Sequence, residues 1–343
     1  MVKRPTLKDL ADAADVGVAT VDRVLNGRGH VREATIDRVI EAAESIGYPT
    51  RSLESRRTKA TLPRVRFGFV LHKGAQQFYQ DFARELQKAV AGRMDVGGSC
   101  DIRFAASQSP ADFAKEMVDI AKTCDVIASS AVNHQSLTGI VEDLTAAGKP
   151  VFALLNDFAQ GVRQNYLGLD NVKVGRIAAW MIVTQIRDPG KLAVFVGGNR
   201  WHGHLLREAG FQSYLREFAM PFKMLDTVVN LETRQVTYEA TLELLNRHPD
   251  LRGIYVAGGG MEGAIAALRE MRPPGKVALV VNELTEESRN ALAERYVSMV
   301  IATPLKELCH DLIGLMIDAA RDGPDANAGQ HFLPPQLFVP ESI

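Results

Sequence analysis

Apolar residues in the first 48 positions recur with the period of short α-helices. They stand at i, i+3, i+4 and i+7 in the run Leu7, Leu10, Ala11 and Ala14. This spacing places them on one side of a helix. Thr6, directly before the run, is the expected N-cap. A short first helix is therefore predicted.

Two more helices are predicted from the same pattern. A tight turn is expected at residues 15–17, with Gly17 taking the unusual backbone angle. The inward positions of the second helix are Val21, Val24 and Leu25. The third helix lies between residues 32 and 48 and ends at Gly47. Its inward positions are Ile36, Val39, Ile40, Ala43 and Ile46. Three short helices that share one small core are predicted.

The outward face of the second helix has the composition of a base-reading surface. Near the helix N-terminus it carries Val18, Ala19, Thr20, Asp22 and Arg23. The major groove of DNA admits an α-helix, and an arginine there can pair with guanine. The alternative is a three-helix module that serves only packing or dimerisation.

Residues 6–48, TLKDLADAADVGVATVDRVLNGRGHVREATIDRVIEAAESIGY, resemble the N-terminal headpiece of the lactose-repressor (LacI/GalR) family. The resemblance implies that Val18 and Ala19 choose bases and that Arg23 reads a base. It also implies contact with the phosphate backbone or its neighbourhood at Thr6, Thr20, Asn26 and His30. For Asn26 and His30, a simple role as turn residues is the alternative.

Asp22 departs from the family pattern, which usually has a small hydroxyl residue at this position. A carboxylate that faces phosphate would be repelled. Three roles therefore stay open for Asp22: a local cap, a pair with Arg23, or acceptance of a hydrogen bond from cytosine.

Residues 49–63 lose the apolar periodicity and have the composition of a basic linker. In the resembled family this linker becomes a hinge helix on the operator and inserts an apolar wedge, normally leucine, into the minor groove. Here the wedge position holds Arg56, and the nearest apolar residue is Leu53. Either Leu53 is the wedge, or Arg51 and Arg56 read a narrow groove, or the linker is unstructured.

The rest of the chain alternates short apolar runs with helical patterns. The first set of runs is 66–71, 102–105, 126–128, 151–155 and 166–169. The second set is 192–196, 227–229, 254–256, 277–281 and 299–301. This alternation predicts βαβ units in two parallel-sheet lobes. Parallel sheets bind ligands beyond the carboxyl ends of their strands, so a cleft between the lobes is expected.

Polar and aromatic residues follow the predicted strands at the positions that would face this cleft. In the first set they are His72, Lys73, Phe78, Tyr79, Asn133, His134, Asn156 and Asp157. In the later elements they are Asp170, Asn171, Arg200, Trp201, Asn282 and Glu283. Amide and carboxylate groups with aromatic rings suit a sugar, which offers hydroxyls at its rim and C–H groups on its faces.

This part of the chain is similar to ribose-type periplasmic sugar-binding proteins. The resemblance rests on Gln77-Phe78-Tyr79, on Leu169-Asp170-Asn171 with Gly175-Arg176, and on the helix that contains 207–211. The effector-binding residues predicted from the strand ends and this resemblance are Phe78, Tyr79, Asn133, Asp157, Asp170, Asn171, Arg200, Trp201 and Asn282.

The second resemblance has departures that bear on the ligand. Leu205 stands where the family has a pocket arginine, and Arg200 is the candidate replacement. Asn282-Glu283 stands near the place of an expected aspartate. Four basic residues near the rim would favour a carboxylated or phosphorylated sugar, unless they are solvated surface. They are His72, Lys73, His134 and Arg200. Asp170 has the alternative of a helix cap or lobe-crossing tie, and Trp201 that of interlobe packing.

One rival motif points to a nucleotide cofactor. Gly258, Gly260 and Gly263 form a GxGxxG after a strand, and Glu283 lies near the expected acidic distance. A dinucleotide site, however, needs this motif on the first strand of its sheet, and here it comes late. The chain also lacks a GxSxG elbow, HExxH or a P-loop. An enzyme is not expected; the alternative is a DNA-binding protein whose C-terminal part binds a nucleotide cofactor or catalyses a small-molecule reaction.

Composition and charge agree with a regulator. The chain has 343 residues, 46% of them hydrophobic, and a net charge of -1. Residues 1–66 hold 13 Lys/Arg against 9 Asp/Glu, and the remainder 27 against 32, so the basic surplus lies in the segment expected to meet DNA. The three cysteines form no CxxC pair, and no apolar stretch of about 18 residues occurs. A cytoplasmic protein without metal or cofactor is expected.

The predicted fold is an N-terminal all-α helix-turn-helix headpiece followed by an α/β sensor of two parallel-sheet lobes, like a periplasmic binding protein. The predicted domains are 1–48 for DNA binding, 49–63 for the hinge, and 64–343 for effector binding and dimerisation. We expect a transcriptional repressor that binds a palindromic operator in double-stranded DNA as a homodimer. Its expected effector is a sugar or sugar acid, and no membrane contact is expected.

Overall fold

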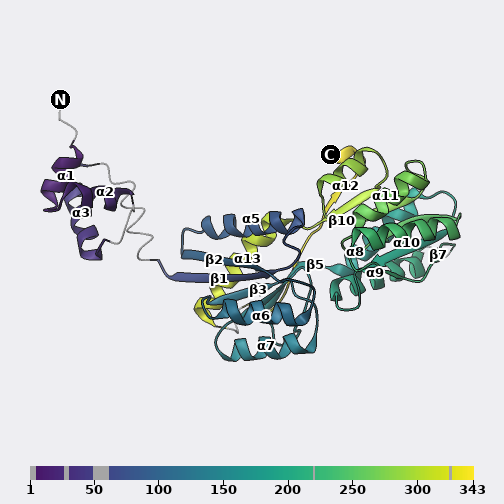
Figure 1. Ribbon diagram of the computed structural model, residues 1–343, viewed down its shortest axis with the longest axis horizontal. Coiled ribbons are helices and arrows are strands. Elements are labelled where there is room, and N and C mark those ends of the chain that lie inside the picture. The colour runs from purple at the N-terminus through teal and green to yellow at the C-terminus, as the bar shows by residue number, and fades with distance from the viewer. Residues whose placement is uncertain (1–4, 27–30, 49–61, 219–220, 324–326) are drawn as a thin grey trace. The chain divides into compact units, whose positions relative to one another are not determined.

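The computed structural model describes residues 5–26, 31–48, 62–218, 221–323 and 327–343. The chain divides into two compact units (Figure 1). The first unit consists of Met1–Arg64 together with Arg93–Gly98, and the second of Val65–Gly92 and Ser99–Ile343. Within the described residues, no helix combines the length and the apolar character needed to span a bilayer.

The first unit contains the three predicted helices, α1 (Leu7–Ala13), α2 (Val18–Asn26) and α3 (Glu33–Ser45). They share a core whose fully buried members are Leu10, Ala11, Val21, Val39, Ile40 and Ala43. The Thr6 side chain accepts from the Asp9 amide, and the Asp9 carboxylate accepts from the Thr6 amide, which satisfies two free donors at the start of α1. The predicted helices and their shared core are confirmed.

The turn between α1 and α2 differs from the prediction in one residue. Asp15 has the positive φ, +52°, whereas Gly17 has none. The Gly17 carbonyl instead accepts from the Thr20 and Val21 amides, so Gly17 stands at the start of α2. The left-handed position falls directly after the end of α1, and an aspartate tolerates it better than most residues.

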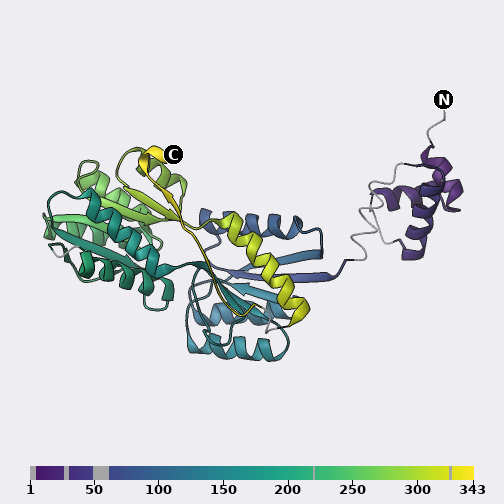
Figure 2. The same cartoon turned by 180° about the vertical axis from the view of Figure 1, so that it is seen from behind.

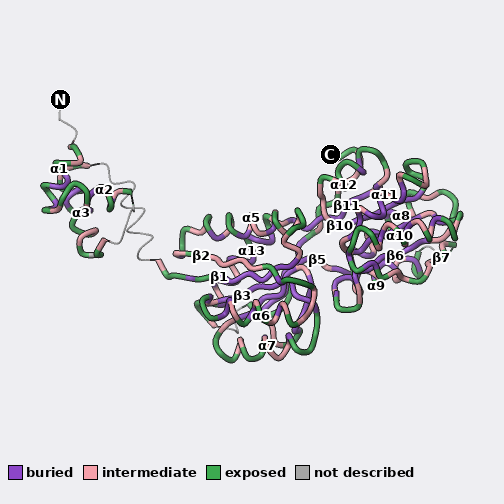
Figure 3. The backbone as a smooth tube through the Cα atoms, viewed as in Figure 1, coloured by how far each residue is buried: buried purple, intermediate pink, exposed green. Residues whose placement is uncertain are grey.

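The second unit has two lobes, each built on a largely parallel sheet. The first-lobe sheet has the order β12-β5-β4-β3-β1-β2. Its strands are β1 (Arg64–Leu71), β2 (Gly97–Phe104), β3 (Val126–Ser129), β4 (Val151–Leu154), β5 (Asn165–Leu169) and β12 (Gly329–Leu333). Its helices are α5 (Gln77–Ala91), α6 (Pro110–Ala121), α7 (Gln135–Ala146) and α13 (Leu305–Asp322). The central strands are mostly buried, the edge strands β2 and β12 are mostly not, and the helices bury only one side (Figure 3).

The second-lobe sheet has the order β13-β11-β10-β9-β6-β7, and β8 also pairs with β6. Its strands are β6 (Lys191–Val196), β7 (Lys223–Met224), β8 (Val228–Val229), β9 (Leu251–Val256), β10 (Ala278–Asn282), β11 (Met299–Ala302) and β13 (Gln336–Phe338). Its helices are α8 (Asn171–Gln185), α9 (His202–Phe218), α10 (Arg234–Arg247), α11 (Met261–Met271) and α12 (Glu286–Ala293). A short 3-10 helix, Pro340–Ser342, ends the chain. The prediction of two parallel-sheet lobes is confirmed.

The chain passes between the lobes three times, after β5, after β11 and after β12. After the second crossing, α13 returns to pack on α5 of the first lobe (Figure 2). After the third, β13 pairs antiparallel with β11. The strands β7, β12 and β13 were not predicted, because they are short or largely exposed strands at sheet edges.

The contact between α8 and α9 depends on two glycines. A methyl group at Gly210 would overlap the carbonyl oxygen of Val172, and one at Gly175 would overlap that of Arg207. Backbone cannot yield as a flexible side chain can. We therefore expect Gly210→Ala to lower the free energy of unfolding by about 2 kcal/mol, measured by chemical denaturation. Gly139→Ala is the matched control, because a methyl group there meets nothing within 4 Å. It should stabilise α7 slightly, and equal losses in both variants would contradict this account of the packing.

Candidate functional site

The exposed end of α2 carries the predicted base-reading residues. Val18 is 46% exposed, although it is a large apolar side chain. Ala19 and Arg23 are also exposed, and Thr20 is half-buried. An apolar side chain left in water at a helix N-terminus is available to a partner surface. The first unit thus presents a small surface of apolar, polar and basic side chains on one helix, of the kind that fits a major groove.

Two further residues predicted to meet DNA, Thr6 and Asn26, have local partners in the helices. Thr6 caps α1, and its hydroxyl lies 2.7 Å from the Asp9 carboxylate. Asn26 donates to the Asp22 carboxylate at 2.6 Å, so Asp22 has a partner one turn along its own helix. Both bonds lie on the surface and leave these residues accessible. His30, Arg51, Leu53 and Arg56 lie outside the described residues, and their roles stay predictions.

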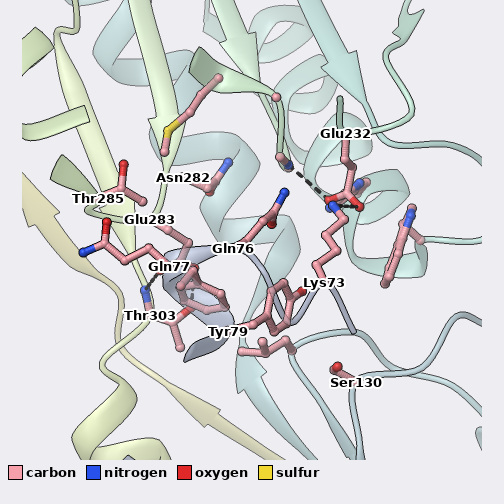
Figure 4. Close-up of a pocket in the computed structure, with 18 of the residues that line it drawn as sticks. Lys73, Gln76, Gln77, Tyr79, Ser130, Glu232, Asn282, Glu283, Thr285 and Thr303 are labelled. Atoms are coloured by element: carbon pink, nitrogen blue, oxygen red, sulfur yellow. Dashed lines mark hydrogen bonds and ion pairs between the residues drawn. The ribbon is translucent and has the colours of Figure 1, made fainter. Parts of the chain in front are cut away.

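A cavity of about 420 Å³ lies in the second unit at the carboxyl ends of strands from both lobes. Its size falls within the range of about 300–1,000 Å³ typical of small-molecule sites. Both lobes supply its polar lining, and ten of the lining residues are labelled in Figure 4. The position matches the cleft predicted from the strand pattern.

Several predicted residues line this cavity. Of the predicted effector-binding set they are Phe78, Tyr79, Trp201 and Asn282. Four other strand-end residues also line it: His72, Lys73, Asn156 and Glu283. Trp201 stacks on His72 of the first lobe with ring centroids 4.8 Å apart, so interlobe packing is part of its role.

The other five predicted effector-binding residues are not among the described residues that line the cavity. Asp170 is the N-cap of α8 and accepts from the Lys173 amide. Asp157 is paired with Arg163 at 2.5 Å. Asn171 is buried and accepts a hydrogen bond from Arg207. Asn133 and Arg200 are exposed. These five residues therefore do not line the cavity in this structure, and their part in binding an effector stays a prediction.

Two of the basic residues predicted at the rim of the cleft, His134 and Arg200, do not line the cavity. His134 caps α7 by accepting from the Ser136 amide, and Arg200 is exposed outside the lining. The arginine that does line the cavity is Arg207, which sequence reasoning missed. It donates to the Asn171 side chain and to the Ala257 carbonyl, both at 2.7 Å. Asn171 therefore positions the arginine.

A buried ion pair joins the two lobes across the cavity. Lys73 Nζ of the first lobe lies 2.7 Å from Glu232 Oε2 of the second, with side chains 15% and 8% exposed. The other Glu232 oxygen accepts from the Gly259 amide at 3.1 Å. Burial alone would raise the pKa of Glu232, but the Lys73 ammonium and nearby histidines lower it to about 2. Glu232 was not predicted from the sequence, and it gives the cavity lining a negative charge.

Two buried histidines beside this pair are neutral at pH 7. Burial lowers the pKa of His72 to about 3 and that of His204 to about 4, although Glu232 opposes both shifts. His72 lies 3.0 Å from the Tyr79 hydroxyl and 3.2 Å from Ser130 Oγ. The His204 ring accepts from the Gly197 amide at 3.1 Å. Neither histidine supplies a positive charge to a ligand.

Hydrogen bonds between the lobes complete this wall. Gln108 of the first lobe donates to Glu232 at 3.2 Å and accepts from Trp201 Nε1 at 3.3 Å. The Asn156 side chain accepts from the Gly203 amide at 3.0 Å, near the N-terminus of α9. Each bond depends on the lobe arrangement, so a change in the angle between the lobes would break several at once.

The glycines of the GxGxxG run are explained by close packing. A methyl group at Gly258 would overlap the His204 ring, and one at Gly263 would overlap the Arg234 carbonyl. Gly260 has φ +91° and is the N-cap of α11. Glu283 accepts from the Thr303 hydroxyl and amide at 2.7 and 3.0 Å. Each member of the rival motif thus has a structural role.

Comparisons with known proteins agree with both units. Residues 67–323 match the periplasmic binding protein domain, and residues 6–50 match the bacterial regulatory proteins of the lacI family. The HTH-type transcriptional regulator RegA of Clostridium saccharobutylicum is 27% identical over 300 residues, covering 80% of this chain and 81% of RegA. The sucrose operon repressor of Streptococcus mutans is 23% identical, covering 98% of this chain and 99% of the repressor.

Solved structures show the same fold for the second unit. A periplasmic solute-binding protein of an ABC transporter from Actinobacillus succinogenes, solved with bound D-allose, has a TM-score of 0.73 at 15% identity. The match covers 81% of this chain and 98% of that one. The chain therefore belongs to the lacI family of bacterial regulatory proteins and is a DNA-binding transcriptional regulator whose sensor is a periplasmic binding protein domain.

Proposed function

We propose that this regulator is a repressor that acts as a homodimer on a palindromic operator and responds to a small polyhydroxylated effector. The observation that carries the proposal is a cavity lined by both lobes in a chain that also has an exposed recognition helix. A single helix of this size reads few bases, so two headpieces on two half-sites would supply the specificity. Operator DNA also implies action in the cytoplasm.

The effector would act through the angle between the lobes. A ligand that touches both lobes binds one arrangement better than the other, and this difference is the free energy available for regulation. Repression of sugar-operon genes is supported by the relative from Streptococcus mutans, a sucrose operon repressor. Residues 49–63 would transmit the change to the headpieces, with Leu53 or Arg56 in the minor groove.

We do not propose an anionic sugar as the effector, because the cavity lining is acidic. The cavity is lined by five glutamates against one lysine and one arginine. The lysine is paired with Glu232, and the lining histidines are neutral. A carboxylate or phosphate would therefore meet a wall with excess negative charge. Hydroxyl groups fit the many oxygen acceptors better.

The regulatory role is tested by two measurements on the full-length protein. An operator selected from random DNA is titrated with and without sugars and polyols that raise the sensor's melting temperature. We expect at least one of them to change the operator dissociation constant, by about 5- to 150-fold. Ligands that stabilise the sensor and leave operator affinity unchanged would contradict the proposal.

Replacement of Arg23 tests the base-reading surface. We expect Arg23→Ala to weaken operator binding by about 1–3 kcal/mol and to leave binding to random DNA nearly unchanged at the same salt concentration. Arg38→Ala, an exposed arginine on α3, is the matched control and should cost less. If Arg23→Ala weakens binding to both DNAs equally, Arg23 contacts phosphate.

A further inference from the structure

One wall of the cavity holds a buried hydrogen-bond acceptor without a protein partner. Asn282, 4% exposed, donates through Nδ2 to the Val256 carbonyl at 2.8 Å. A carbonyl can only accept, so this bond fixes the orientation of the amide and leaves Oδ1 as the free atom. Among the described residues, Asn282 Oδ1 has no hydrogen-bond partner. A ligand group that donates would satisfy it.

The next residue, Glu283, adds a carboxylate that forms no ion pair with a described residue. The Glu283 carboxylate accepts hydrogen bonds from one neutral residue, Thr303, through its amide and its hydroxyl. Within the described part of the chain, no lysine or arginine forms an ion pair with Glu283. Burial raises the pKa of Glu283, and the charge of Arg207 offsets only part of that rise. Its backbone has φ +67°, a conformation that non-glycine residues rarely adopt. The fold thus holds a carboxylate at the cavity wall at some cost in strain.

The cations that line the cavity are already engaged elsewhere. Lys73 is bound to Glu232. Arg207 donates to Asn171 and to the Ala257 carbonyl. The cavity lining also includes three further glutamates, Glu262, Glu286 and Glu287. Figure 4 shows Asn282 and Glu283 on the side of the cavity opposite the Lys73–Glu232 pair.

We propose that the effector carries a protonated nitrogen, as an amino sugar does, and that this ammonium lies between Asn282 Oδ1 and the Glu283 carboxylate. The inference rests on the proposed function and narrows its ligand class. A neutral hydroxyl could satisfy Asn282 but would leave the Glu283 charge uncompensated after water is displaced. An ammonium satisfies both, through charge-assisted hydrogen bonds.

The experiment compares matched hexoses by calorimetry on the full-length protein near neutral pH. The probes are glucosamine, galactosamine and mannosamine, their parent hexoses, and the uncharged N-acetyl forms. We expect at least one amine to bind about 10-fold or more tightly than its parent and its N-acetyl form, the gain of one charge-assisted contact. Glu283→Gln should remove most of this preference, whereas Glu239→Gln, an exposed glutamate on α10, should keep it.

Two results would overturn the inference. One is that no hexosamine binds, or that the parent hexoses bind as tightly. The other is that a folded Glu283→Gln variant keeps the full amine preference. If that variant does not fold, Asn282→Asp in its place should strengthen amine binding, and a weakening would count against the proposal. The proposed function would fail in a different measurement, the operator titration, if no ligand that binds the sensor changed the operator dissociation constant.

Discussion

Replacing Lys73 with methionine is expected to lower the free energy of unfolding of the sensor by about 3 kcal/mol, because it leaves the Glu232 carboxylate buried without its cation. Methionine keeps nearly the length of lysine, so the loss of packing is small. Glu232 retains the Gly259 amide and Gln108 as donors, which limits the loss. The measurement is urea denaturation followed by tryptophan fluorescence. Both tryptophans, Trp180 and Trp201, lie in the sensor, so the signal excludes the headpiece.

A double-mutant cycle separates the ion pair from the rest of the site. Glu232→Gln removes the charge and keeps an oxygen for the Gly259 amide, so the double variant with Lys73→Met should recover at least half of the loss. Lys122→Met is the control, because Lys122 forms an exposed pair with Asp119, and exposed pairs contribute little. A loss at Lys73 no larger than at Lys122 would mean that water screens the interlobe pair.

Most of the fold could be predicted from sequence because the central parallel strands of both sheets are apolar runs. The run 192–196 is buried in full as part of β6, and the same holds for 151–154 in β4. The strands that escaped prediction are edge strands. In β12, for example, Gly329 and Gln330 are exposed, and Leu333 alone is buried. Such strands are held by backbone hydrogen bonds, which leave no side-chain pattern.

The candidate site was predicted only in part, because a strand end fixes where the chain lies and not where each side chain points. Asp157 follows β4 as expected, but Leu155 has φ +63°, and beyond that turn the carboxylate meets Arg163. For Asp170, a helix cap was the alternative to effector binding, and Asp170 is indeed the N-cap of α8. Glu232 lies three residues after β8 and is the second of two successive residues with positive φ, so the predicted strand 227–229 does not indicate where its side chain points.

Arg207 could not be predicted from the sequence for a different reason. It lies inside α9, so neither the strand ends nor the loops indicate it, and Arg200 in the preceding loop was the candidate instead. The glycines that let α8 and α9 approach closely bring Arg207 against Asn171. This contact joins helices whose pairing is a property of the tertiary structure. Sequence reasoning on single elements could not find it.

Lowering the pH from 7 to 5 is expected to destabilise the sensor by about 4 kcal/mol through His72 and His204. Their pKa values in the folded protein, about 3 and about 4, lie below the ordinary value of about 6.5. The unfolded chain therefore binds more protons below pH 6.5, and stability falls as the pH drops toward 4. Each histidine costs about 1.4 kcal/mol per pH unit in this window.

The neighbouring carboxylates set the limits of this window. The pKa of Glu232 is about 2, so its pair with Lys73 stays ionised in the folded protein at pH 5. Burial raises the pKa of Glu283, and its protonation would offset a small part of the loss. His204→Asn keeps an acceptor for the Gly197 amide and removes one titration, so it should reduce the slope of stability against pH by about half. A slope that is the same in wild type and in His204→Asn would show that His204 is solvated enough to titrate normally in the folded sensor.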